Sequence, residues 1–130
     1  MQASKIPAGE YVPTADQRVV IHCVPWSHFE EYLRLRGDTA GPRIAYLNGA
    51  LELMSPSKDH ERINNVIGDL IKAYSDWADL EYGCYGSWTL KDSPVEAGAE
   101  PDDCYIFGPD QSKETPDLVI EVVWTHGGIN

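Results

Sequence analysis

The most constraining feature of the sequence is the run from Pro116 to Trp124, in which one carboxylate lies among apolar side chains. Its β-branched and aliphatic residues predict a buried strand, and Glu121 falls inside it. With a period of two, Glu121 faces the same side as Val119 and Val123, which we expect to shield it from water. Because an ionised carboxylate in such a place is costly, a cation or a hydrogen-bond donor must meet Glu121.

A second acidic feature precedes this run. Asp102 follows Pro101, at the start of a short strand expected over residues 102–107. Short turns join the later strands, so we expect them to be neighbours in one antiparallel sheet. The Asp102 and Glu121 carboxylates would then meet, and paired carboxylates are good ligands for a hard divalent cation.

Other interpretations of these acids stay open. Asp102 can simply be a turn residue after a proline. Glu121 can pair with an arginine, either Arg43 or Arg62, without any metal. Asp117 is a rival acid because it shares a strand face with Glu121, although its Pro-Asp pair is better interpreted as the opening of the strand.

Composition limits the possible partners. A chain of 130 residues forms one domain at most, and its net charge of −11 opposes tight, non-specific binding to phosphate backbones. A bound divalent cation or a partner chain would offset that charge locally. The three cysteines form no CxxC pair, which indicates reduced thiols and a cytoplasmic protein, and no apolar run is long enough to suggest a membrane partner.

The rest of the chain predicts a loose arm, strands, two helices and a hairpin. The expected elements, in order, are a loose arm over 1–17, a strand over 18–24, a helix begun by a Ser27–Glu30 capping box and ended by Gly37, a hairpin of Ile44–Leu47 and Leu51–Met54 around Asn48-Gly49, a helix from Lys58 to Asp79 capped by Ser57, and a strand over Tyr82–Lys91 before a turn over 92–98. The helix after Ser57 carries apolar residues at helical spacing, so it should lie across a sheet.

Two further residues have open roles. His60, near the start of the long helix, is either a surface residue or points into a site beside the acids. Glu52, in the hairpin, is either an exposed strand acid or a member of that site.

Taken together, these motifs resemble the Uma-type restriction endonuclease family, which belongs to the PD-(D/E)XK nuclease superfamily. The resemblance covers about residues 19–130 and rests on Glu100-Pro101-Asp102, on the run from Pro116 to Val122, on the hairpin and helix start from Arg43 to His60, and on Gly86 to Lys91. It implies an α/β (α+β) fold with a restriction-endonuclease-like core. In that core a mixed sheet is flanked by helices, with a helix and a β-hairpin near the N-terminus.

The resemblance also implies the site residues. Asp102 and Glu121 would be catalytic ligands of Mg²⁺ or Mn²⁺, the Val122 carbonyl would complete the metal shell, and His60 would assist. The position where the superfamily pattern has a lysine is Val123. The pattern also continues with a helix and a strand, which the nuclease-like domain expected over residues 18–130 lacks.

The implied function is metal-dependent hydrolysis of phosphodiester bonds in nucleic acid, with DNA favoured over RNA. The alternative is a catalytically inactive nuclease-like module that binds or regulates a partner; Val123 and the acidic balance favour it. We also expect a homodimer, because an incomplete sheet leaves open edges and apolar surface for another chain to cover.

Overall fold

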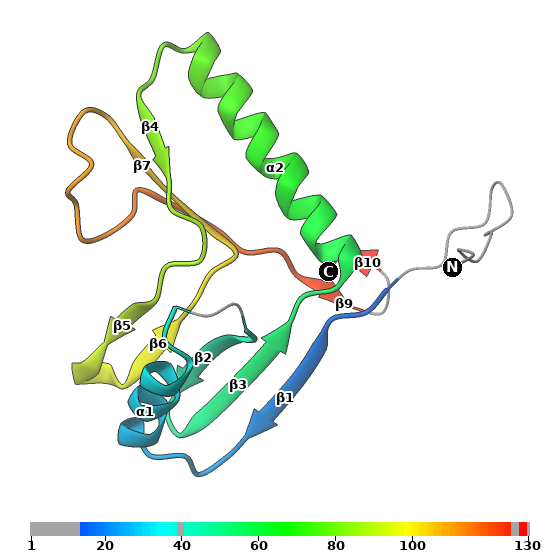
Figure 1. The fold of residues 1–130 in the computed structure, drawn as a ribbon, viewed down its shortest axis with the longest axis vertical. Helices are drawn as coiled ribbons and strands as arrows, with labels where there is room; N and C mark the ends of the chain where they lie inside the picture. The colour runs from blue at the N-terminus through cyan, green and yellow to red at the C-terminus, as the bar shows by residue number, and fades with distance from the viewer. Residues whose placement is uncertain (1–13, 39–40, 126–127, 130) are drawn as a thin grey trace, which may run out of the picture.

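The computed structural model describes residues 14–38, 41–125 and 128–129. Its elements are β1 (Gln17–Ile21), α1 (Trp26–Arg36), β2 (Arg43–Leu47), β3 (Ala50–Ser55), α2 (Lys58–Trp77), β4 (Tyr82–Cys84), β5 (Leu90–Asp92), the 3₁₀ turn η1 (Ser93–Val95), β6 (Ala97–Ala99), β7 (Asp103–Phe107), β8 (Leu118–Ile120), β9 (Trp124–Thr125) and β10 (Gly128–Ile129). The helices and antiparallel sheets confirm the expected α+β class (Figure 1). None of the helices described is both long and apolar enough to cross a membrane.

The larger sheet has five strands in the order β1-β3-β2-β6-β5. Its centre is the β2–β3 hairpin, in which Leu47 pairs with Ala50 across the turn. Asn48 and Gly49 have φ values of 45° and 87°, as this type of tight turn requires. The hairpin predicted from the Asn-Gly pair is therefore confirmed.

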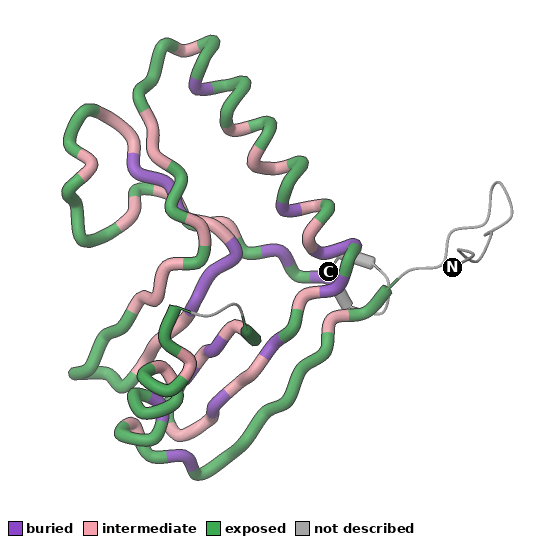
Figure 2. Tube along the Cα trace, in the orientation of Figure 1, coloured by how far each residue is buried: buried purple, intermediate pink, exposed green. Residues whose placement is uncertain are grey.

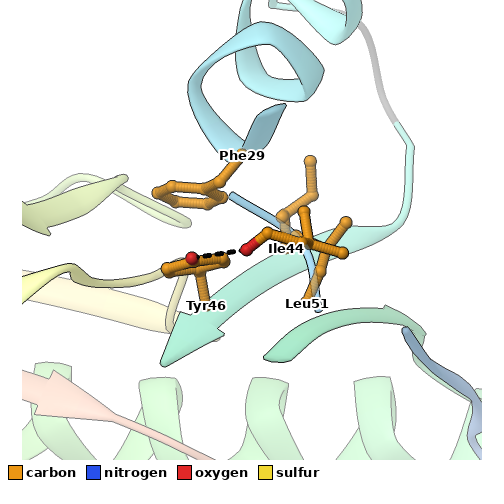
Figure 3. Packing of buried hydrophobic residues seen from close by; sticks show 5 residues of the cluster. Phe29, Ile44, Tyr46 and Leu51 are labelled. Carbon is orange, nitrogen blue, oxygen red and sulfur yellow. Dashed lines mark hydrogen bonds between the residues drawn. The ribbon is translucent and has the colours of Figure 1, made fainter. Parts of the chain in front are cut away.

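Helix α1 covers one face of this sheet and supplies its core. Phe29 is fully buried and stacks on Tyr46 of β2, with ring centroids 5.2 Å apart. Ile44 and Leu51 pack beside them, and the Tyr46 hydroxyl donates a 2.6 Å hydrogen bond to the Val24 carbonyl (Figure 3). Packing against α1 thus holds the central strands of the sheet in place from one side.

The capping box predicted for α1 is wrong. The helix starts at Trp26, directly after Pro25, and no side chain caps it. The Pro25 carbonyl instead accepts the backbone N–H groups of His28 and Phe29. Because the helix starts before Ser27, that hydroxyl lies within the first turn and is not placed to cap it.

A smaller sheet, in the order β4-β7-β8, brings the two acidic runs together. Asp103 pairs with Ile120, and the Asp102 N–H donates to the Ile120 carbonyl at 3.1 Å. The expected adjacency of these antiparallel strands is confirmed. The single strand expected over residues 82–91 is wrong, because the chain divides there into β4 and β5, which belong to different sheets, and Gly86 adopts a φ of 65° between them.

Two further expectations fail in this part of the chain. The turn expected over residues 92–98 contains η1 and the start of β6. The final strand is shorter than predicted: β8 ends at Ile120, and Glu121 lies just beyond it. Val119 and Val123 are exposed, whereas Val122 is buried, so the face expected to shield Glu121 from water is the outer one.

Helix α2 forms as predicted at its start, where the Ser57 hydroxyl accepts the His60 N–H at 3.1 Å. It ends at Trp77, two residues earlier than expected. Its apolar residues do not all lie across a sheet as predicted, because Ile63, Ile67 and Ile71 are half-buried whereas Val66, Leu70, Tyr74 and Trp77 are exposed. The buried residues of α2 are Asp59, His60, Asn64 and Ser75. Figure 2 shows that most of the helix is exposed or half-buried.

The close contact between α1 and β6 gives the first prediction. A Cβ atom added at Gly98 would lie 2.6 Å from the Phe29 Cζ atom, well inside contact distance. We expect Gly98→Ala to lower the free energy of unfolding by about 1–3 kcal/mol, because the ring must shift within a packed core. Urea denaturation measures this loss. The second substitution Phe29→Leu should recover part of it, and a double variant no more stable than Gly98→Ala would contradict the packing.

Candidate functional site

The candidate site is built around Asp102, whose side chain is 0% exposed. Its Oδ1 atom lies 2.7 Å from His60 Nε2 and 2.9 Å from Arg43 Nη1. Its Oδ2 atom accepts the Val122 N–H at 2.6 Å. Asp102 is therefore not a simple turn residue: it joins β2, α2 and the segment after β8.

Glu121 lies next to this buried carboxylate. The residue lines a cavity of about 250 Å³, together with Arg43, Glu52 and Val122. Partial desolvation, followed by contact with the Asp102 carboxylate and its charge, raises the pKa of Glu121 to about 7, although Arg43 and His60 act in the opposite direction. The residue as a whole is exposed, so the desolvation of its carboxyl group is only partial. The structure thus brings the two predicted acids together.

His60 is fully buried between two carboxylates. Its Nδ1 atom lies 2.7 Å from Asp16 Oδ2, and its Nε2 atom faces Asp102. Burial acts to lower the pKa of His60, but the hydrogen bonds to Asp16 and Asp102 outweigh it and raise that pKa. Because both ring nitrogens are engaged, the imidazole is arranged to position Asp102.

Asp16 is a site residue that the sequence did not reveal. Residues 14–17 were expected to belong to a loose arm, yet Asp16 Oδ1 accepts the Ser57 N–H at 2.8 Å while Oδ2 meets His60. The Thr14 backbone N–H donates to Asp59 Oδ2 at 2.7 Å, and Trp124 Nε1 donates to the Thr14 carbonyl at 2.6 Å. These contacts hold the segment against the start of α2. The remainder of the predicted arm, residues 1–13, lies outside the described residues.

Glu100 is a second residue whose role was not predicted, although it belongs to the quoted Glu-Pro-Asp motif. It is buried and forms an ion pair with Arg36 of α1. It also accepts the Ile44 N–H at 2.9 Å and the Thr89 hydroxyl at 3.0 Å. Burial alone would raise the pKa of Glu100, but the Arg36 guanidinium, Ile44 and Thr89 hold it below its usual range. Glu100 thereby ties α1 to β2 beside the site.

The remaining acids and arginines differ in their partners and in their distance from the site. Arg43 takes the Asp102 pairing, whereas Arg62 is exposed on α2. Asp117 accepts the Phe107 N–H at 2.8 Å and pairs with Lys113, so it fixes the opening of β8, as its Pro-Asp pair predicted. Glu52 pairs with Arg18 at 3.3 Å and lines the cavity, so it lies at the edge of the site.

The oxygen atoms of Asp102 and its neighbours can be compared with the ligands that a divalent cation requires. The Asp102 Oδ1 atom has two partners, Oδ2 accepts the Val122 N–H, and the Glu121 carboxyl group also lies in hydrogen-bonding contact with this carboxylate. Among the residues that the structure describes, no group of three His, Cys, Asp or Glu side chains is arranged to hold a metal. Two carboxylates completed by carbonyl oxygen and water still match Mg²⁺, which usually keeps several waters. Because Glu121 is raised in pKa beside Asp102, a cation would relieve their repulsion.

The raised pKa of Glu121 predicts a pH dependence of stability. The folded state binds the proton of this group more tightly than the unfolded state, whose carboxyl has a pKa near 4.5. This contribution to stability is complete below about pH 4.5 and is lost as the pH rises through 7. In chelator-treated buffer, Glu121→Gln should therefore gain stability relative to the wild type across this range. This prediction would be contradicted if the unfolding free energies of the wild type and of Glu121→Gln, measured by urea denaturation, changed in parallel with pH.

Asp16 predicts a second measurable loss. In Asp16→Ala, the buried Ser57 N–H and His60 Nδ1 lose their acceptor, and we expect about 2 kcal/mol of destabilisation by urea denaturation. Asp92→Ala serves as the control, because Asp92 is exposed and its side chain does not cap η1. Equal small effects in both variants would show that the segment before β1 does not support the site.

Comparison with known proteins gives one positive result. The model of the Uma2 family, described as "Putative restriction endonuclease", matches residues 29–128. No curated protein and no solved structure matches the chain. Restriction-endonuclease-like proteins generally use divalent metals, and the family description implies binding to nucleic acid. Since the match spans most of the chain and includes Arg43, His60, Asp102 and Glu121, the chain belongs to the Uma2 family.

Proposed function

We propose that this chain is a metal-dependent endonuclease that hydrolyses phosphodiester bonds of nucleic acid, with DNA as the favoured substrate. The observation that carries the proposal is the contact between the Glu121 carboxyl group and the buried Asp102 carboxylate, next to a cavity that Glu121 and the cationic Arg43 line. Family membership supports the nuclease class. The family description as a restriction endonuclease favours DNA over RNA.

In this proposal Asp102 and Glu121 hold Mg²⁺ or Mn²⁺, and the Val122 carbonyl contributes a further oxygen. The bound ion would lower the pKa of a water molecule and neutralise charge on the phosphate. His60, Arg43 and the Val122 N–H keep the Asp102 carboxylate in one orientation, so it does not reorganise during the reaction. His60 is a positioning residue here rather than a general base, because both ring nitrogens already face carboxylates.

The surroundings offer space for a substrate. A larger groove of about 920 Å³ adjoins the cavity, and the two share Ala45, Glu52 and Ala99 as lining residues. Arg18 and Arg43 are the basic residues that line the cavity, and they would contact phosphate oxygens. The net charge of −11 makes binding depend on the divalent ion, which lowers the repulsion at the site.

A second candidate function is a nuclease-like binding or regulatory module without catalysis. It is favoured by the satisfaction of Asp102 through Arg43, His60 and the Val122 N–H, because an internal arginine then compensates the buried charge. Val123 at the position of the superfamily lysine supports the same alternative. The nuclease needs a metal ion at the acid pair and must cleave nucleic acid, whereas the module needs neither.

Calorimetric titration with Mn²⁺ distinguishes them. We expect the wild type to bind the ion, and Asp102→Asn and Glu121→Gln each to weaken binding at least about tenfold, because each removes an anionic ligand. Asp117→Asn is the matched control, since that carboxylate is engaged with Lys113 and Phe107 away from the site. Cleavage of plasmid DNA with Mg²⁺ or Mn²⁺, and its loss with a chelator, then tests the reaction.

The outcomes separate the candidates. Binding that is lost in both site variants but retained in Asp117→Asn places the ion at the acid pair. Metal binding without cleavage of DNA or RNA would support a module that keeps the ion but not the chemistry. A wild-type chain that binds no Mn²⁺ would overturn the nuclease proposal.

A further inference from the structure

Helix α2 presents an apolar surface that no described element covers. Val66, Leu70, Tyr74 and Trp77 are 49%, 65%, 59% and 83% exposed, and the Tyr74 and Trp77 rings lie 6.0 Å apart. The residues that α2 buries are all polar. The buried positions of this helix are therefore polar, whereas its largest apolar side chains are exposed. An exposed apolar surface of this kind marks an interaction site.

The outward residues have the spacing of a helix–helix contact. The half-buried Ile63 and the exposed Val66, Leu70, Ala73 and Trp77 follow one another at intervals of three, four, three and four residues. This heptad spacing keeps one seam of a helix against a partner helix. With Tyr74, these residues form a continuous surface that we name the α2 stripe. Since α2 has 20 residues, the helix is about 30 Å long.

Charges along one edge of the α2 stripe favour a particular partner orientation. Arg62, Asp69 and Asp76 recur every seven residues along that edge, and none makes an ion pair within the described part of the chain. Two antiparallel copies of α2 would place Arg62 of each copy near Asp76 of the other. A parallel arrangement would place this edge against the other edge of the partner helix, which carries Ile67 and Tyr74, and would form no such pairs. Complementarity therefore favours an antiparallel pair related by a two-fold axis near Asp69.

Other partner classes fit the α2 stripe less well. An amphipathic helix that lies on a membrane carries an excess of Lys and Arg on its polar face. The charged residues of α2 are instead the acids Asp59, Glu61, Asp69 and Asp76 and the bases Lys58, Arg62 and Lys72. The same balance opposes contact with a phosphate backbone.

We propose that the α2 stripe is a homodimer interface, in which α2 of a second copy of this chain packs antiparallel against it. No residue of α2 lines the cavity at Glu121, so the interface does not depend on the proposed nuclease function. Leu70, near the middle of the helix, lies close to the two-fold axis. The two Asp69 carboxylates lie close together there, which is the unfavourable contact in the arrangement.

Sedimentation equilibrium of the full chain tests the interface. We expect a wild-type dimer, and we expect Leu70→Glu to weaken self-association at least about tenfold, because a charge enters the seam. Leu35→Glu is the matched control, since Leu35 is 67% exposed on α1 and Leu70 is 65% exposed on α2. Circular dichroism checks that each variant remains folded, as expected for substitutions at exposed positions.

Charge substitutions test the orientation. Arg62→Asp and Asp76→Arg should each weaken the dimer about three- to tenfold, and the chain with both changes should recover wild-type affinity, because the pair is restored with its charges exchanged. Asp69→Asn should strengthen the dimer. A wild-type chain that is monomeric at about 100 μM, or a dimer unaffected by Leu70→Glu, would overturn the proposal. Failure of the double variant to recover would overturn the antiparallel orientation.

Discussion

The buried Asp102 carboxylate is the point on which the rest of the structure depends. Three partners from distant parts of the sequence meet it: the Arg43 guanidinium, the His60 imidazole and the Val122 N–H. A buried charge is tolerated only when donors or cations surround it, so β2, α2 and the segment after β8 must all be in place together. The same contacts that allow Asp102 to be buried also bring Glu121 beside it. The need to surround the buried Asp102 charge therefore links the fold to the site.

Much of this arrangement follows from local signals in the sequence. The Asn48-Gly49 turn and the Ser57 cap form as predicted, because each depends on residues that are close in the sequence. Asn and Gly adopt the positive φ angles of the turn, and the Ser57 side chain accepts a helix N–H that would otherwise be unpaired. The meeting of the two acidic runs was predictable because short turns join their strands. The wrong predictions concern features that tertiary contacts determine. Sequence pattern alone did not reveal that residues 82–91 divide between two sheets or that α2 buries its polar face.

The polar inner face of α2 has a physical explanation in the site. Asp59 and His60 bind the segment before β1, and His60 also binds Asp102, so the first turn of the helix is committed to hydrogen bonds rather than to apolar packing. Farther along, Gly68 lies close to the Tyr105 hydroxyl, at a position where a larger residue would crowd it. With these small and polar residues inward, the largest apolar residues of the helix, Leu70, Tyr74 and Trp77, are left exposed. The geometry of the site and the exposure of the α2 stripe thus have a common origin.

The contacts of Asp16 bear on where the functional unit begins. The family match starts at residue 29, whereas Asp16 and β1 precede it. Residues Thr14 to Asp16 bridge α2 and Trp124, and β1 forms the edge strand of the larger sheet beside β3. A boundary drawn from sequence similarity would leave the His60 ring facing an empty position and would expose β3 as a new edge. The cooperative unit of this protein is therefore larger than its recognisable family region, and its extra part supports the residues nearest the acids.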